Sequence, residues 1–170
     1  MTVTITKASL LLDSANEAVE EARLRHRRDL VSQHRLLATL GHAELANLIE
    51  SSSWLSAREG DLISVQGAPV DDVVFIVEGN AREEVRDAGR GEFRAVVNFL
   101  GPGDEIGLLS LLDRSPHHAT AIAMKRTQGL RAPVALLEEM LKVHPEWYES
   151  IAQLAVARLR ASSLWLQALI

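Results

Sequence analysis

The residues that suggest chemistry lie together in one short stretch, IGLLSLLDRSPHHATA, at 106–121. Gly107 opens the stretch, Pro116 precedes two adjacent histidines, His117 and His118, and small residues close it. Glycine allows backbone to approach a ligand closely, and imidazole binds metals when neutral and anions when protonated. The stretch is too apolar for an ordinary surface loop and too interrupted for a strand or a long helix. It is therefore a candidate ligand loop.

The two adjacent histidines do not predict a metal site. Neighbouring residues of a strand point to opposite faces, so His117 and His118 cannot easily bind one ion. The chain has no cysteine, which excludes cysteine-rich zinc sites and disulfides. The other histidines are scattered over helical zones: His26, His34, His42 and His144. His117 alone remains as a weak anion contact, with tighter anion binding expected below about pH 6.5.

No arrangement typical of catalysis is present, so we predict that the chain is not an enzyme and has no catalytic residue. Ser110 and Ser115 lack the context of a nucleophile elbow. The glycine-rich GPGDEIG is not a Walker loop, because no Gly-Lys-Ser/Thr follows.

Charge and composition argue against nucleic acid and membrane as partners. The formal net charge is −5, and the only basic cluster, RLRHRR at 23–28, follows glutamates that neutralise it. Aromatic residues are 4%, too few for base-stacking platforms. No apolar run approaches the roughly 18 residues that span a membrane, and the N-terminus does not resemble a signal peptide. A cytoplasmic location fits these features.

The elements that would position the loop fall into three zones. Residues about 10–57 are predicted to be helical, with a capping residue at Asp13 or Ser14 and helical spacing that continues to Trp54. Residues about 58–134 are short runs rich in Val, Ile and Phe, separated by Gly, Asp, Asn and Pro. Turn signals at such regular intervals predict a sandwich, roll or barrel.

The third zone, about 135–170, is predicted to be helical and interrupted by Pro145. The helix after Pro145 is long and apolar on two faces, which implies two packing partners. One is the β-domain, and the other is a second subunit or another protein.

From about residue 36 to 165, the chain resembles the cyclic-nucleotide-binding domain of the catabolite activator protein (Crp/Fnr) family. REGDLISVQGAPVDDVVFIVEGNA resembles the opening strands, FLGPGDEIG the approach to the phosphate-binding cassette, and GLLSLLDRSPHHATA the cassette itself. A short helix, a proline and a long helix follow at the family's spacing. The resemblance implies a mainly β fold: a β-roll or jelly roll (double-stranded β-helix), with helices before it and a long C-terminal helix after it.

The resemblance also implies a ligand pocket whose chemistry is altered here. In the family, a glutamate after the cassette glycine binds the ribose, and an arginine after the proline binds the cyclic phosphate. This chain has Leu108 and His117 at these positions, and a histidine cannot reproduce the guanidinium fork. Ser162 and Ser163 match positions that contact the purine, although two serines also permit close helix packing. The implied pocket residues are Gly107, Leu108, Leu109, His117, His118, Ala119, Thr120, Ser162 and Ser163.

The predicted organisation has three parts: a helical extension at 1–40, the roll with flanking short helices at 41–146, and a lid or dimerisation helix at 147–170. One hypothesis is a non-enzymatic sensor or regulatory module for cyclic AMP or another cyclic nucleotide, with weak, changed or lost binding. A second is a structural oligomerisation module that no longer binds nucleotide. A third is the sensor part of a larger regulator, without its helix-turn-helix. A homodimer or a partner protein on the C-terminal helix is expected.

Overall fold

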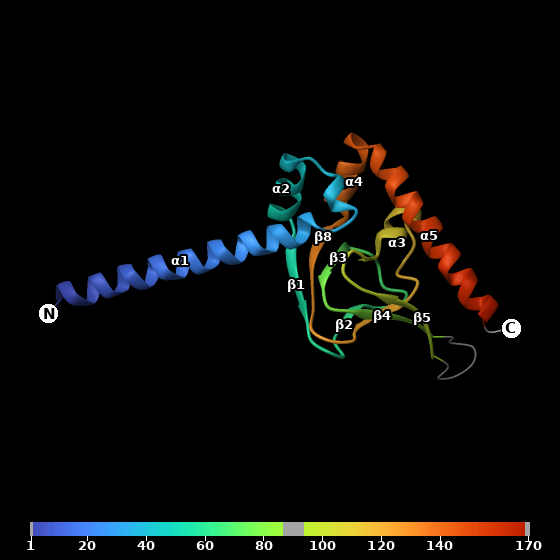
Figure 1. Ribbon diagram of the computed structural model, residues 1–170, viewed down its shortest axis with the longest axis horizontal. Coiled ribbons are helices and arrows are strands. Elements are labelled where there is room, and N and C mark those ends of the chain that lie inside the picture. Colours follow the sequence, from blue (N-terminus) through green and yellow to red (C-terminus); the bar gives the residue numbers. More distant parts are fainter. Residues whose placement is uncertain (1, 87–93, 169–170) are drawn as a thin grey trace.

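The computed structural model describes residues 2–86 and 94–168, except for the side chains of 2–11, 13, 94 and 161–168. Helices lie on both sides of a central run of strands in the sequence (Figure 1). The helices are α1 (Thr2–Ser32), the 3-10 turn η1 (Leu37–Thr39), α2 (His42–Glu50), α3 (Leu108–Asp113), α4 (Val134–Val143) and α5 (Glu146–Ala168).

The strands form two antiparallel sheets that face each other as a roll. One sheet has the order β1-β8-β3-β6 and the other β2-β7-β4-β5. The strands are β1 (Ser53–Ala57), β2 (Leu62–Ser64), β3 (Asp72–Glu78), β4 (Ala81–Arg86), β5 (Arg94–Leu100), β6 (Glu105–Ile106), β7 (Thr120–Ala123) and β8 (Thr127–Pro133). This architecture confirms the predicted β-roll with preceding helices and a long C-terminal helix.

Strand β3 explains how the fold holds two apolar layers. Its Phe75 faces the helices, in a cluster that includes Leu37 of η1 and Leu137 of α4. The alternate residues Val74 and Ile76 face the interior of the roll. Because successive side chains of a strand point to opposite faces, the uninterrupted apolar run of β3 stabilises both layers at once.

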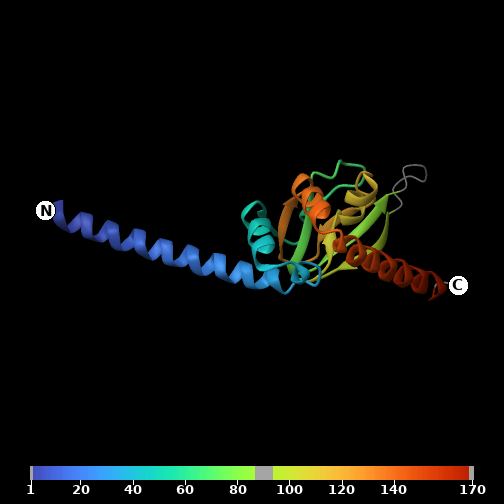
Figure 2. The same cartoon turned by 90° about the horizontal axis from the view of Figure 1, so that it is seen from above.

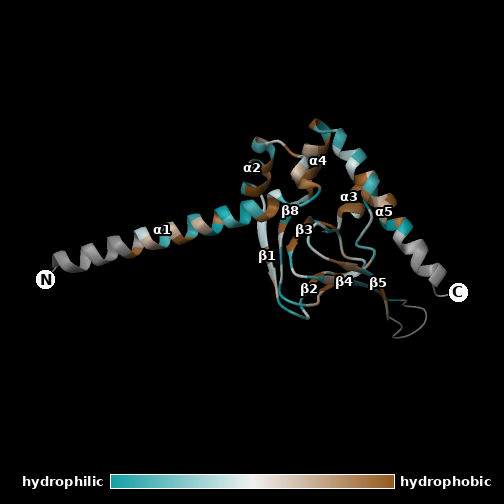
Figure 3. Cartoon of the chain, viewed as in Figure 1, coloured by the Kyte–Doolittle hydropathy of each residue, from teal (hydrophilic) through white to brown (hydrophobic). Residues whose placement is uncertain are grey.

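Helix α1 stands away from this body. In Figures 1 and 2 it projects beyond the roll, and only its C-terminal end reaches the other helices. Val31, at that end, is fully buried, whereas Leu12 and Val19 are 64% and 66% exposed. Glu21 and Arg25, four residues apart on this helix, form an exposed ion pair at 4.0 Å. Figure 3 shows many hydrophilic residues along the coloured part of this helix.

The predicted helical zone at 10–57 needs two corrections. Helix α1 begins at Thr2 and continues through Asp13 and Ser14, so neither residue caps it. Trp54 belongs to β1, which pairs with β8. Its indole N–H donates to Gln128 at 3.2 Å, and Arg27 lies 4.8 Å above its ring. This tertiary pairing outweighs the local helical spacing.

The helical zone after the roll agrees with its pattern. Helix α4 ends at Val143, and α5 begins at Glu146, directly after Pro145. Ile151 of α5 is fully buried, whereas Leu159 is 68% exposed. No helix among the described residues is both long and apolar enough to cross a membrane. The division at 1–40, 41–146 and 147–170 stays a prediction.

Candidate functional site

The candidate loop is a strand, a turn and a short helix in direct succession. Strand β6 ends at Ile106, Gly107 turns the chain with a φ of 90°, and α3 begins at Leu108. A Cβ on Gly107 would lie 3.2 Å from the carbonyl oxygen of Asp72 and 3.2 Å from Cε1 of His117. Glycine is therefore required both by the left-handed backbone and by the space around it.

Leu108 lies in the core and not at the mouth of the roll. Its side chain is 2% exposed and belongs to the apolar cluster between the helices and β3. The side chain at the position of the family's ribose-binding glutamate therefore points into packed protein. The ligand contact predicted for Leu108 stays a prediction.

His117 is half-buried and lines a cavity of about 230 Å³ with Asp72 and Arg131. Burial lowers the pKa of its imidazole below the usual value, and this effect outweighs the opposing field of Asp72. The ring is therefore neutral at pH 7. Its backbone carbonyl accepts from Gly67 N–H at 2.8 Å, and its own N–H donates to Ala68 at 3.0 Å.

His118 turns to a different neighbour. Its Nε2 lies 3.9 Å from a carboxylate oxygen of Glu83, which is almost fully buried on β4. Asn98 on β5 donates to the same oxygen at 3.1 Å. The two histidines therefore have different partners, and no group of three metal-binding side chains occurs in the part of the chain that the structure describes.

The remaining predicted site residues are spread around the loop. Leu109 is half-buried, and Ala119 is buried. The hydroxyl of Thr120 accepts from Gln66 N–H at 3.0 Å. Ser162 and Ser163 belong to α5, but their side chains lie outside the described residues. Their contact with a ligand stays a prediction, as do those of the other site residues.

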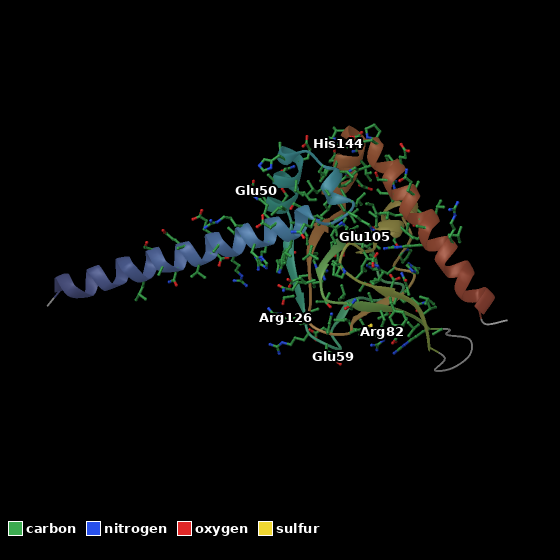
Figure 4. All side chains as sticks on the ribbon, viewed as in Figure 1. Glu50, Glu59, Arg82, Glu105, Arg126 and His144 are labelled. Carbon is green, nitrogen blue, oxygen red and sulfur yellow. The ribbon has the colours of Figure 1, made fainter. Side chains whose placement is uncertain are left out.

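Sequence reasoning missed the charged residues that surround the loop. On β8, Arg131 Nη1 donates to both carboxylate oxygens of Asp72, at 3.0 and 2.9 Å. Arg158 of α5 reaches the Glu105 carboxylate, which lies inside the fold (Figure 4). The sequence held one local signal for Arg131. In QGLRAPV it lies between two apolar residues of a strand, so its side chain points to the opposite face from theirs. The partners depend on strand pairing and helix crossing.

Comparison with known proteins agrees with this geometry. A family model of the cyclic nucleotide-binding domain matches residues 54–144, more than half of the 170 residues. A cAMP-dependent protein kinase regulatory subunit of Mycosarcoma maydis is 34% identical over 104 residues, which are 61% of this chain and 19% of that protein. Lysophospholipase nte1 of Neosartorya fischeri is 26% identical over 107 residues, 63% of this chain and 7% of that protein. The chain thus spans a small part of the curated relatives it matches.

Solved structures show the same fold. The catabolite activator protein of Thermus thermophilus superposes with a TM-score of 0.64 and 25% identity, over 79% of this chain and 62% of that chain. The sensor domain of the transcriptional regulator DNR from Pseudomonas aeruginosa has a TM-score of 0.69 and 17% identity, over 81% and 91%. Roll, cassette and flanking helices, together with the family match, lead to one conclusion: the chain belongs to the cyclic nucleotide-binding domain family, of the type found in Crp/Fnr regulators.

Proposed function

We propose that the chain is a non-enzymatic regulatory module that keeps the cyclic-nucleotide-binding roll but has weak affinity for cyclic AMP and cyclic GMP. Its relatives include a kinase regulatory subunit and a catabolite activator, both regulators by name. Arg158 ties α5 to β6, directly before the cassette. A change in the cassette would therefore be passed to α5, and from α5 to a second subunit or another protein.

The observation that carries the weak affinity is His117 in place of a fixed cation. The imidazole is half-buried, and its pKa is lowered by burial, so it brings no positive charge at pH 7. A charge-assisted hydrogen bond contributes about 1.5–3 kcal/mol. Its loss weakens binding of a cyclic phosphate by about ten- to 150-fold, taking tenfold per 1.4 kcal/mol.

The test is calorimetry with cyclic AMP and cyclic GMP at millimolar concentration. His117→Arg should tighten binding of at least one of them by about tenfold or more, because it restores the guanidinium beside Gly107. His118→Arg is the matched control, since it adds the same charge at the adjacent exposed residue. Binding by the unaltered protein at micromolar concentration or below would contradict the proposal.

A second candidate function, oligomerisation through α1, is favoured by the exposure of that helix. Leu12, Ala15, Val19, Ala22 and His26 follow one another at alternating spacings of three and four residues, and each of them is exposed. This is the repeat with which two helices pack along a common seam. The proposed partner is a second copy of the chain.

Sedimentation of the unaltered protein and of Val19→Asp tests this function. The Asp variant should shift the protein towards the monomer, because a charge in the seam is buried on pairing. Glu17→Gln, a change on another exposed face of α1, is the control. A protein that sediments as a monomer at all concentrations would exclude oligomerisation and leave the first proposal untouched.

A further inference from the structure

The cavity beside the cassette contains one strong cation. It has a volume of about 230 Å³, and its lining includes Arg131, His117, Asp71 and Asp72. His117 is neutral at pH 7 because burial lowers the pKa of its ring. Arg131 is therefore the only positive charge among the lining residues. It is therefore the one side chain of the lining that can pair with the charge of an anion at pH 7.

Arg131 is held by one carboxylate but not saturated by it. Both hydrogen bonds to Asp72 come from Nη1, at 3.0 and 2.9 Å. A guanidinium has five N–H donors, and those on Nε and Nη2 have no partner among the described residues. The two side chains are 31% and 28% exposed, so solvent and small solutes reach the pair.

The pair lies against the cassette. A Cβ on Gly107 would meet the carbonyl oxygen of Asp72 and the ring of His117, each at 3.2 Å. Arg131 therefore stands at the same corner of the roll as the turn that opens the cassette. Carboxylate and phosphate oxygens bind a guanidinium with the same geometry, so the chain's own carboxylate sits where a ligand's anionic group would sit.

We propose that Arg131 is the anion-binding residue of this cavity and that Asp72 is an internal competitor for it. The ligand class is a small phosphate-bearing molecule, since the cavity is smaller than the about 300–1,000 Å³ of typical ligand pockets. This inference rests on one part of the proposed function, namely that His117 carries no positive charge. Its new element is that Arg131, on β8 and outside the cassette, supplies the positive charge instead.

Asp71 provides the control for the competing charge. It lines the same cavity and carries the same charge as its neighbour, but its carboxylate makes no ion pair within the described residues. Asp71→Asn and Asp72→Asn thus change the field of the cavity alike, and only Asp72→Asn releases Arg131. A difference between the two variants isolates the release of the guanidinium.

The experiment is calorimetry in a phosphate-free buffer, with inorganic phosphate and glycerol phosphate as probes. Asp72→Asn should tighten binding of phosphate by about tenfold, the effect of one charge-assisted hydrogen bond at a partly exposed site. Asp71→Asn should have a clearly smaller effect, and Arg131→Gln should abolish binding in the Asp72→Asn background. Tighter binding of the ester than of the free ion assigns the cavity to a phosphate ester, and the reverse order assigns it to the ion.

If Asp71→Asn and Asp72→Asn tightened phosphate binding equally, the effect would come only from removing a negative charge from the cavity. That result would overturn the proposal. Weaker binding in Asp72→Asn, or none in any variant, would also overturn it. Thermal unfolding of each variant confirms that it is folded during the titration. The proposed function is contradicted by a different measurement, tight binding of a cyclic nucleotide by the unaltered protein. The two failures are therefore distinguishable.

Discussion

Arg158 of α5 makes two hydrogen bonds to one residue, Glu105 of β6: one to its carboxylate and one to its backbone carbonyl oxygen, at 3.1 Å. The Glu105 side chain is fully buried, and its oxygen Oε1 has no hydrogen bond among the described residues. Arg35 lies 3.8 Å from that oxygen. A buried ion pair thus fixes α5 to the strand that leads directly into Gly107.

Removing the arginine should be costly. Arg158→Leu leaves the Glu105 carboxylate buried without its main partner, a change that typically costs about 3–5 kcal/mol of unfolding free energy. Urea denaturation measures the loss. Arg160→Leu is the control, because Arg160 is exposed on the same helix and forms no ion pair in the described structure; its effect should stay within about 0.5 kcal/mol. Equal losses in the two variants would show that the pair does not stabilise α5.

Glu105 should also make stability depend on pH in a defined direction. Burial raises the pKa of its carboxyl, in spite of the opposing fields of Arg158 and Arg35. The folded state then holds this proton more tightly than the unfolded state, whose pKa is 4.5. The stabilisation is present below pH 4.5 and is lost as the pH rises through the higher folded value.

The measurement compares unfolding free energies of the unaltered protein and Glu105→Gln from pH 4 to 7. Relative to the Gln variant, the unaltered protein should lose stability as the pH rises. Asp104 and the two arginines act on the same carboxylate and remain in both proteins. Glu59→Gln removes the same charge at an exposed site and is the surface control. A difference that grows in the opposite direction would show that the ion pair outweighs burial.

His34 should give the opposite slope. The ring of His34 packs edge-on against Phe75, and its Nε2 lies 3.3 Å from the carbonyl oxygen of Asp104. Burial lowers the pKa of the imidazole to about 4. The folded pKa is below the unfolded 6.5, so the stabilisation is complete above pH 6.5 and is lost as the pH falls towards 4. The loss amounts to about 3 kcal/mol.

His34→Gln tests this assignment by acid titration of the folded state. The variant should be less stable at pH 7 but should lose less stability on acidification than the unaltered protein. His26→Gln, on the exposed face of α1, is the control: its stability should fall with decreasing pH as steeply as that of the unaltered protein. Identical slopes for all three proteins would exclude His34 as the acid-sensitive group.

The features that could be predicted from the sequence are those that neighbouring residues determine. The apolar runs between turn residues sufficed to predict a sandwich, roll or barrel at about 58–134, and the resemblance to the family, which includes the glycines at 101, 103 and 107, placed the cassette. Contacts between distant residues were not predictable: Glu105 and Arg158 are 53 residues apart, and Asp72 and Arg131 are 59 apart. Such pairs depend on strand register and helix crossing, which no local spacing specifies. The strand β1 was missed because its residues follow a helix without a glycine or proline between them.

Truncating Leu108 should lower the free energy of unfolding as much as truncating a core residue does. It is 2% exposed, whereas Leu112 on the same helix α3 is 38% exposed. Leu108→Ala should cost about 2–5 kcal/mol, because it removes buried methyl groups and leaves a cavity. Leu112→Ala, the matched control, should cost much less. Thermal unfolding of both variants gives the comparison, and a loss at Leu108 as small as that expected at Leu112 would place Leu108 outside the core.

Gly107 should be the least replaceable glycine of the loop region. Gly107 and Gly67 both have a left-handed backbone, with φ of 90° and 80°. A Cβ on Gly67 meets nothing within 4 Å, so Gly67→Ala reports the backbone strain alone, about 1–2 kcal/mol. A Cβ on Gly107 also meets Asp72 and His117 at 3.2 Å, so Gly107→Ala should cost about 1 kcal/mol or more beyond that. Equal changes in unfolding free energy would show that the cassette turn has room for a side chain.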